Sequence, residues 1–281
     1  MKDLKYLFAY TVPISVYISF MSTGIWTYST VFYVFILLPI LDFLLGESKE
    51  NFSKEDASHQ NKKWIFDIML YFNIPIIFGL LYIVFSSFQS NDYNVFETVG
   101  LAFSTGLLLS INGINVAHEL GHRKPYYERF LSKLLYMPCL YMHFYIEHNF
   151  GHHLHVATPE DGATAKYNQS VYSFWFTSVT KQYFDAWKNQ KKLLKTKNSS
   201  FISVKNDMIW YHLIQPLYLF VIYYLFSFEV MIFALVVGII SFLFLECINY
   251  IEHYGLQRQK LASGRYERVQ PHHSWNSNFN I

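Results

Sequence analysis

The stretch VFETVGLAFSTGLLLSINGINVA, residues 95–117, decides the fold, because it is long and apolar enough to cross a bilayer and continues directly into HELGH at residues 118–122. His118 and His122 lie four residues apart, so on a helix they share one face and can bind one metal ion. Imidazole is the commonest protein ligand for transition metals such as iron, zinc and copper. The stretch therefore predicts a metal centre at the end of a membrane-spanning helix.

The composition extends this pattern to the whole chain. The 281 residues are 52% hydrophobic, 20% aromatic and only 15% charged, which is typical of a membrane protein. We expect residues 1–281 to form a single all-α, membrane-embedded domain. About six predicted transmembrane helices form three hairpins, at residues 5–24 with 26–46, 65–88 with 95–117, and 208–226 with 230–251. A seventh apolar segment, residues 131–146, is predicted to lie at the interface or against the bundle.

Positive charge predicts the orientation of these helices. All 22 Lys and Arg residues lie at the N-terminus, between the first two hairpins, from residue 123 to 205, or from residue 258 to 268. The hairpin tips near residues 24, 86–94 and 227–229 carry none. By the positive-inside rule, the termini, both long loops and every histidine box are expected in the cytoplasm. We expect no cleaved signal peptide, because the first segment lacks a small-residue cleavage site. Residues 188–200, KNQKKLLKTKNSS, read as a solvated basic connection.

A second histidine box, EHNFGHH at residues 147–153, follows the seventh apolar segment. On an ideal helix His148 and His152 form another i, i+4 pair, and His153 points about 100° away from His152. Because two adjacent histidines seldom bind one metal comfortably, this doublet predicts two metals, one on each side.

The third box, NYIEHYG at residues 249–255, ends the last predicted helix. Its His253 shares a helical face with two polar residues further up that helix. Carboxylates beside the histidines either orient an imidazole by accepting its second N–H or bind metal directly. The residues considered for this supporting role are Glu119, Glu147, Glu246, Asn249, Glu252 and His273.

Two other interpretations explain fewer of these residues. HExxH alone is a zinc-protease signature, but a single zinc uses about three protein ligands and leaves several boxed histidines unexplained. Histidines that only pack in the core account for one or two positions, not for three boxes. Cys139 and Cys247 form no CxxC pair, so no thiolate zinc site is indicated. A thiolate-free histidine site suits iron and dioxygen chemistry, but spacing alone does not choose among desaturation, hydroxylation and decarbonylation.

Five motifs together resemble the membrane alkane 1-monooxygenase (alkane hydroxylase) family: HELGH, EHNFGHH, ATPEDGATAKY at 157–167, NYIEHYGLQR at 249–258 and RYERVQPHHSWNSN at 265–278. NYIEHYGL is the most specific, since membrane desaturases share only the general histidine-box plan. The resemblance implies a six-helix fold in the bacterial inner membrane with a cytoplasmic non-haem di-iron site. It also implies dioxygen as oxidant, rubredoxin with its reductase as electron donor, and terminal hydroxylation of a medium-chain n-alkane, with no nucleic-acid partner. Matched position by position, the iron ligands would be His118, His122, His148, His152, His153 and His253.

One departure from the family pattern concerns the C-terminus. The family continues into a further HxxxHH box, so we expect the natural chain to extend beyond residue 281. The alternatives are a membrane fatty acid desaturase or other lipid-modifying di-iron oxidase, or an inactive truncated fragment. Arg123, Lys124 and Arg258 are candidates to dock an acidic electron carrier, although positive-inside topology explains them equally well.

Overall fold

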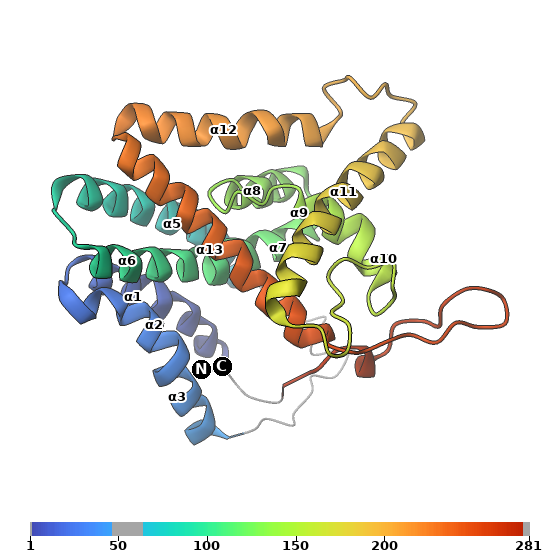
Figure 1. Ribbon diagram of the computed structural model, residues 1–281, viewed down its shortest axis with the longest axis horizontal. Helices are drawn as coiled ribbons and strands as arrows, with labels where there is room; N and C mark the ends of the chain where they lie inside the picture. Colours follow the sequence, from blue (N-terminus) through green and yellow to red (C-terminus); the bar gives the residue numbers. More distant parts are fainter. Residues whose placement is uncertain (1, 47–63, 278–281) are drawn as a thin grey trace.

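The computed structural model describes residues 2–46 and 64–277, and within them every regular element is a helix (Figure 1). The basic loop predicted between the first two hairpins lies outside the described residues. The first two hairpins contain η1 Lys2–Tyr10, α1 Thr11–Phe20, η2 Gly24–Tyr28, α2 Ser29–Phe32, η3 Tyr33–Leu37, α3 Leu38–Leu45, α5 Trp64–Ser90, α6 Val95–Leu108, η4 Leu109–Ile114 and α7 Asn115–Gly121. The remaining helices are α8 Tyr126–Tyr136, α9 Phe144–Glu147, η5 His148–His152, α10 His153–His155, α11 Val171–Thr196, α12 Asp207–Leu225, α13 Phe228–His253 and η6 Pro271–His273.

Five helices in the described residues are long and apolar enough to cross a membrane, and they match five of the six predicted segments. The first predicted segment instead gives a shorter apolar helix, Tyr6–Phe20. It is built from the 3₁₀ helix η1, of 9 residues, followed by the α-helix α1, of 10 residues. At about 2.0 Å per residue for the part of η1 from Tyr6 and about 1.5 Å for α1, the apolar helix Tyr6–Phe20 is about 25 Å long, somewhat shorter than the ~30 Å hydrocarbon core.

Capping side chains complete the tips of the second and third hairpins. Asn94 accepts a hydrogen bond from the amide of Glu97 at 3.0 Å, and the Glu97 carboxylate accepts one from the amide of Asn94 at 3.1 Å. At the other tip, Ser227 Oγ accepts from the amide of Val230 at 3.3 Å. These caps satisfy amide groups that have no partner within the helix.

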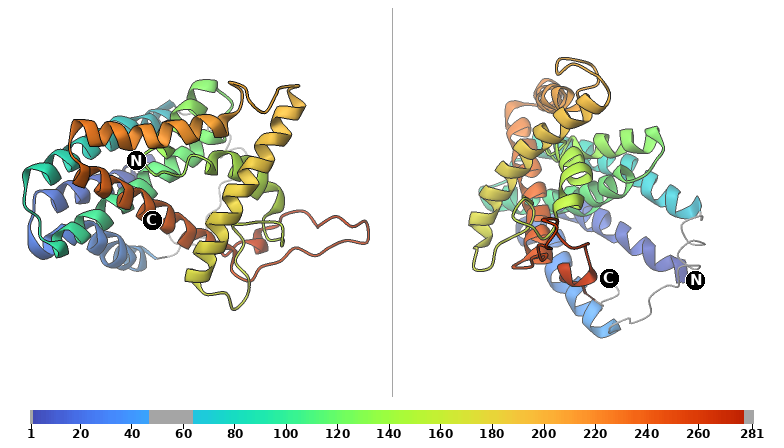
Figure 2. Two further views of the ribbon diagram at one scale, coloured as in Figure 1. Left: turned by 45° about the horizontal axis from the view of Figure 1, so that its top comes forward. Right: turned by 90° about the vertical axis from the view of Figure 1, so that its right-hand side faces the viewer.

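Helix α13 is central to the arrangement. It packs against α6, α12 and α11, while α7 packs against α8 and α9 packs against α11. In Figure 1, α5, α6 and α12 run across the view and α13 crosses them diagonally. The other views show that α10, part of α11 and the C-terminal segment gather at the same end of the bundle (Figure 2). The helix ends that carry histidine boxes converge there.

Two segments differ from the sequence prediction or refine it. The predicted seventh segment packs into the bundle through α8 and α9, with Tyr136 and Tyr141 almost fully buried. Residues 188–200 are not a loop throughout, because α11 continues to Thr196. Its buried Ala186, Gln190 and Leu194 follow at four-residue intervals, so one helical face stays anchored although its lysines are exposed.

Candidate metal centre

Four of the six boxed histidines converge at the ends of α7 and η5. His118 Nε2 lies 2.6 Å from His148 Nε2 and 3.0 Å from His122 Nε2, and His122 Nε2 lies 3.2 Å from His153 Nε2. All four ligand nitrogens lie within 4.8 Å of one another. We call this cluster of His118, His122, His148 and His153 the four-histidine group.

The geometry of η5 decides which histidines meet. The segment is a π-helix, in which the amide of His153 bonds to the carbonyl of His148, five residues back. Side chains five residues apart therefore share a face, and His153 joins His148 in the four-histidine group. The predicted i, i+4 pair of His148 and His152 assumed an α-helix, whereas in this π-helix the nitrogen that joins the four-histidine group is that of His153. Which histidines bind the same metal stays a prediction. The ring centroid of His152 lies 5.1 Å from that of His253 and 5.2 Å from that of His148, on which the His152 ring stacks.

The nitrogen contacts of the four-histidine group fit a bound cation better than hydrogen bonds. Each imidazole Nε2 has one in-plane position, for either a proton or a lone pair. Three contacts link the four nitrogens, and His118 and His122 each take part in two. Hydrogen bonds can therefore satisfy at most two of the three. A cation among the four nitrogens accepts every lone pair, and such a nitrogen-only set suits a first-row transition metal such as iron.

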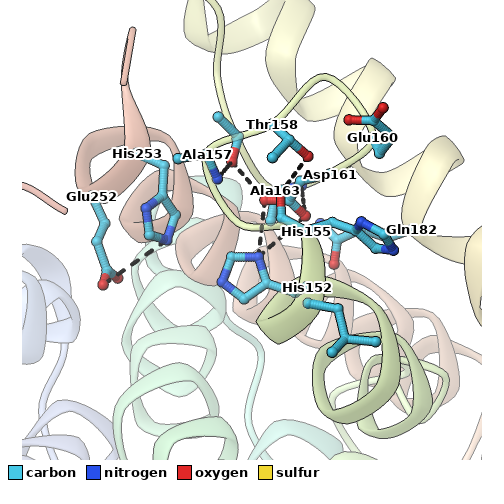
Figure 3. Close-up of polar contacts among 12 residues, drawn as sticks. His152, His155, Ala157, Thr158, Glu160, Asp161, Ala163, Gln182, Glu252 and His253 are labelled. Carbon is cyan, nitrogen blue, oxygen red and sulfur yellow. Dashed lines mark hydrogen bonds and ion pairs between the residues drawn. The ribbon is translucent and has the colours of Figure 1, made fainter. Parts of the chain in front are cut away.

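The second group, His152 and His253, which we call the histidine pair, is held by hydrogen bonds; Figure 3 shows both rings and the contact of His152 with Asp161. His152 Nδ1 donates to Asp161 Oδ2 at 3.0 Å, and His253 Nδ1 donates to the carbonyl of His273 at 3.3 Å. A carboxylate and a carbonyl only accept, so both Nδ1 atoms carry the proton. Each Nε2 is thereby left with a free lone pair, which is the tautomer a metal ligand needs.

Asp161 lies in the ATPEDGATAKY motif, and its contact with His152 was not predicted from the sequence. Its carboxylate also accepts from Thr164 Oγ1 at 2.6 Å and from the amide of Ala163 at 3.2 Å (Figure 3). Thr164 Oγ1 in turn accepts from the amide of Ala157 at 2.9 Å. The signal that could have identified Asp161 was an acidic residue in a turn shortly after the second box, since such carboxylates commonly orient ligand histidines.

The two groups differ electrostatically. Burial, together with the neighbouring imidazoles, lowers the pKa of His148 well below its ordinary value, and the pKa of His153 is lowered for the same reasons. Burial also acts to lower the pKa of His152, but its hydrogen bond to Asp161 outweighs this and the pKa is raised. Burial acts to raise the pKa of Asp161, yet His152, Thr164 and Ala163 hold it below the ordinary value.

Comparison with known proteins shows which family this chain belongs to. Residues 95–281 match the fatty acid desaturase family. Alkane 1-monooxygenase 2 of Alcanivorax borkumensis is 34% identical over 271 residues, which cover 95% of this chain and 71% of that protein. Alkane 1-monooxygenase 2 of Pseudomonas aeruginosa is 35% identical over 260 residues, covering 90% of this chain and 68% of that protein. The chain belongs to the alkane 1-monooxygenase family.

A more distant relative is similar over almost the whole chain. The hydroxylase component of xylene/toluene monooxygenase from Pseudomonas putida is 25% identical over 285 residues, covering 98% of this chain and 72% of that protein. Membership of the alkane 1-monooxygenase family, within the wider desaturase family, confirms the predicted all-α integral membrane fold and makes the chain a multi-pass membrane protein and an oxidoreductase. The assignment of the six histidines as ligands remains a prediction.

Several residues predicted to support the ligands contact other partners in this family member. Glu119 forms an ion pair with Arg123 at 3.3 Å and contacts no histidine. Glu246 is fully buried and accepts from Ser178 Oγ at 2.6 Å, Gln182 Nε2 at 2.9 Å and Tyr141 OH at 3.0 Å. It therefore connects α13 to α11 and to the segment before α9. Helical spacing places Glu246 on the same face as His253. Glu246 nevertheless lies almost two turns before the helix end, and its hydrogen bonds go to other residues.

Glu147 and Asn249 are buried close to the boxes without a direct histidine contact. Glu147 Oε2 and Asn249 Nδ2 have no hydrogen-bond partner within the described part of the chain. Burial raises the pKa of Glu147 to about 8. A Cβ at Gly151 would lie 2.7 Å from Asn189 Nδ2 and 2.8 Å from Glu147 Oε1, so the glycine of EHNFGHH allows α11 to pack closely here.

Glu252 and His273 both lie beside His253 in the histidine pair, and their supporting role stays a prediction. Glu252 Oε1 lies 4.0 Å from His253 Nε2 and accepts from Ser274 Oγ at 3.3 Å. The backbone carbonyl of Glu252 accepts from the amide of Trp275 at 2.8 Å. The segment after η6 is thus fastened to Glu252, the residue before His253, through both its side chain and its backbone.

A further group, Glu267, His272 and His273, also has metal-ligand composition. His273 Nδ1 accepts a hydrogen bond from the amide of Gln270 at 2.9 Å, so the proton of a neutral ring is on Nε2. This Nε2 lies 3.3 Å from Glu267 Oε1, to which it donates. Because that nitrogen has no free lone pair, the group fits a hydrogen-bonded support of the C-terminal segment rather than a metal site.

Two of the basic residues considered for carrier docking are engaged within the chain. Arg123 forms ion pairs with Asp67, with Glu119 and, at 3.1 Å, with Glu128. Arg258 donates to the backbone carbonyls of Leu154 at 2.8 Å and Glu267 at 3.2 Å. Both guanidinium groups therefore hold box-bearing segments in place.

A cavity of about 500 Å³ opens beside the helix that carries the first box. Its walls come from η1, α5, η4 and α7, and they are mostly apolar, with Asp67, Glu119 and Arg123 at the charged part of the lining. Asn115, three residues before His118, also lines it, but no histidine does. The cavity therefore adjoins the four-histidine group without opening directly onto its nitrogens.

Proposed function

We propose that this protein is a non-haem di-iron monooxygenase that inserts one atom of dioxygen into the terminal methyl group of a medium-chain n-alkane to give the 1-alkanol. Electrons would come from rubredoxin, which rubredoxin reductase keeps reduced. The site would face the cytoplasm at the bacterial inner membrane. The observation that carries this proposal is the convergence of six histidines as a group of four and an adjacent pair, all without thiolates.

The arrangement of the two groups supports two metals rather than one. In the His152–His153 doublet, His153 belongs to the four-histidine group and His152 to the histidine pair. Iron held by these nitrogens would supply the dioxygen chemistry. The histidine pair is deeply buried and its ring orientations are fixed by Asp161 and by the His273 carbonyl. His122 and His153, in contrast, are exposed, which leaves the four-histidine group accessible.

The surrounding helices would provide the substrate site. The box-bearing ends of α7 and α13 continue directly into apolar spans, so an alkane dissolved in the bilayer can approach along the bundle. The work of the chain would be to hold the terminal methyl near the four-histidine group and to exclude water. The names of the relatives from Alcanivorax borkumensis and Pseudomonas aeruginosa support an alkane as that substrate.

Product analysis tests this function. The chain is reconstituted in lipid, loaded with iron under anaerobic conditions and supplied with reduced rubredoxin, n-octane and isotope-labelled dioxygen. We expect 1-octanol that carries the label, detected by gas chromatography and mass spectrometry. His148→Ala should abolish product, whereas His155→Ala, which changes a histidine outside both groups, should not.

A second candidate function, desaturation of a lipid acyl chain, is favoured by the match of residues 95–281 to the fatty acid desaturase family. The same reconstitution separates the two, because desaturation gives an alkene or an unsaturated acyl chain without incorporated label. If neither product forms and less than one iron is bound per chain, both functions are contradicted and an inactive chain is favoured.

A further inference from the structure

A row of aromatic rings leads from the four-histidine group to the surface of α12. The ring of His148 stacks on Phe144, with centroids 4.9 Å apart, and Phe144 stacks on Tyr141 at 5.8 Å. Beyond Tyr141 the row continues to His143 at 4.4 Å and from His143 to Tyr183 at 5.5 Å. It ends with His212, whose ring centroid lies 5.7 Å from that of Tyr183 and 5.2 Å from that of Trp187.

Each tyrosine in this row donates its hydroxyl proton to a base. Tyr141 is buried, and its hydroxyl donates to Glu246 Oε1 at 3.0 Å. The Tyr183 hydroxyl lies 2.8 Å from His212 Nε2. Because His212 Nδ1 donates to the carbonyl of Met208 at 2.7 Å, a neutral His212 has its lone pair on Nε2 and accepts from Tyr183.

A phenol with a hydrogen-bonded base is much easier to oxidise than an isolated phenol, because the proton can leave together with the electron. Closely spaced redox-active rings also carry charge further than a single long transfer, since transfer rates fall steeply with distance. Between the two tyrosines lies His143, whose Nε2 is buried without a hydrogen-bond partner among the described residues. Burial lowers the pKa of His143 to about 3, so its ring is neutral and adds no charge to the row.

We propose that Tyr141 with Glu246, and Tyr183 with His212, form a route by which an oxidising equivalent that has not reacted with substrate leaves the metal centre for the surface. The route would protect the ligand histidines from oxidation. It rests on the proposed function only in assuming that a one-electron oxidant arises at the four-histidine group.

The transfer steps balance as follows. The oxidant gains one electron from Tyr141, and the phenolic proton of Tyr141 moves to Glu246 Oε1. The Tyr141 radical then takes one electron from Tyr183 across the His143 ring and recovers its proton from Glu246, while the proton of Tyr183 moves to His212 Nε2. A soluble thiolate finally gives one electron to the Tyr183 radical and becomes a thiyl radical, and His212 returns the proton.

The direction of transfer follows from the chemistry of tyrosine. Electrons arriving from a strongly reducing carrier cannot be relayed by oxidising a phenol, because that step lies far uphill for such a donor. A strong oxidant at the centre does oxidise phenols. The row therefore suits outward escape of oxidising equivalents and not electron entry.

The test places an oxidant at the four-histidine group without requiring alkane hydroxylation. The full chain is loaded with Cu²⁺ and treated briefly with hydrogen peroxide, and oxidised Tyr, Trp and His residues are mapped by peptide mass spectrometry. We expect oxidation products at Tyr183 and Trp187 to exceed those at Tyr172 and Trp175 several-fold. Tyr172 is 74% exposed on the same helix but lies outside the row, so exposure alone would favour it.

Variants separate the route from chance packing. Tyr141→Phe keeps the ring but removes the proton donor, and it should lower Tyr183 oxidation several-fold while raising oxidation of the boxed histidines. His212→Gln changes an exposed side chain and should move the products from Tyr183 to Tyr141. Tyr172→Phe is the matched control and should change nothing. Equal oxidation of Tyr172 and Tyr183, or a pattern that Tyr141→Phe leaves unaltered, would overturn the route even if alkane hydroxylation is found. Failure of hydroxylation would leave the expected oxidation pattern unchanged.

Discussion

The four-histidine group and the histidine pair use the same side chain but are supported in different ways. In the pair, both Nδ1 atoms donate to fixed acceptors, Asp161 and the His273 carbonyl. In the group of four, no Nδ1 hydrogen bond occurs within the described part of the chain, and the nitrogens approach one another as closely as 2.6 Å. The pair is oriented by loops that fold over it, whereas the group of four is positioned by the backbones of α7 and η5.

This difference implies that the protein itself orients the ligand rings of the histidine pair, whereas a bound metal would be needed to order those of the four-histidine group. Ring orientation in the pair is set before any metal binds, because second hydrogen bonds fix the tautomer. In the group of four, a metal would relieve the contacts between nitrogens that hydrogen bonds cannot all satisfy. Substitutions in the two regions should therefore differ in size and in what restores them.

Loss of a ligand in the four-histidine group should have the largest effect. His148→Ala removes a nitrogen central to the group, and we expect iron binding there to weaken by more than the ~100-fold typical of supporting residues. Iron content after anaerobic loading, measured by plasma mass spectrometry, checks this. His155→Ala is the control, and full loading of the His148 variant would refute the ligand assignment.

Loss of the carboxylate behind His152 should come next. Asp161→Ala leaves the His152 Nδ1 proton without its acceptor, and we expect metal affinity at the histidine pair to fall by about 10–100-fold. Asp161→Asn should recover part of this affinity, because the amide oxygen still accepts from Nδ1. Titration with Co²⁺, followed by its visible absorption, measures both. Asp185→Asn, a change at a carboxylate paired with Lys181 and Lys188, should have no effect.

The pH dependence of the metal-free fold should differ in sign between the two regions. The lowered pKa values of His148 and His153 mean that below pH 6.5, their ordinary pKa, the unfolded chain binds protons that the folded chain does not. These residues should therefore destabilise the fold as pH falls below 6.5. The buried His148 can contribute at most ~1.4 kcal/mol per pH unit, and the exposed His153 contributes less because solvent screens it.

The raised pKa of His152 contributes in the opposite direction, since its stabilisation is complete below pH 6.5 and is lost as pH rises through the folded-state pKa. Thermal unfolding across pH 5–8, a window around the ordinary histidine pKa, measures both contributions. His148→Gln should flatten the loss of stability in acid, and Asp161→Asn should steepen it. If unfolding stability changes with pH equally in the two variants, the proposed electrostatic difference between the two regions is contradicted.

The smallest effect should come from the outer support of the histidine pair. Ser274→Ala removes the hydrogen bond to Glu252, and we expect a loss of unfolding free energy of about 0.5–1 kcal/mol with metal affinity unchanged. Ser199→Ala, which removes an exposed hydrogen bond within a loop, is the matched control. A loss of metal affinity in the Ser274 variant would show that the segment after η6 acts on His253 more directly than its contacts indicate.

Hydrophobicity was sufficient to predict most of the fold. Long apolar segments predicted five spans at nearly their observed bounds, because only a helix satisfies the backbone inside a bilayer. The 3₁₀ start of the first segment was not predictable, since its composition resembles that of any apolar helix. The length of α11 was missed because its lysines dominate the sequence between residues 188 and 197, whereas the buried Gln190 and Leu194 become informative only once packed.

The candidate site was predicted in its residues but not in its grouping. Spacing identified the six histidines, but the pairing of His148 with His153 depends on a local change of helix type. The partner of His152 is Asp161, in a turn whose position is set by tertiary packing. The long-range contacts of Glu246 with Ser178 and Gln182 were equally invisible in a sequence that separates these residues by more than sixty positions.

The π-helical turn at residues 148–152 has a consequence for how such proteins are recognised. A search that expects paired histidines four residues apart pairs His148 with His152. At this turn residues five apart share a face, so His148 and His153 lie together in the four-histidine group. Removing Asn149 or Phe150 from the turn would restore ordinary helical spacing and place the present His153 four residues after His148, so these two histidines would still share a face.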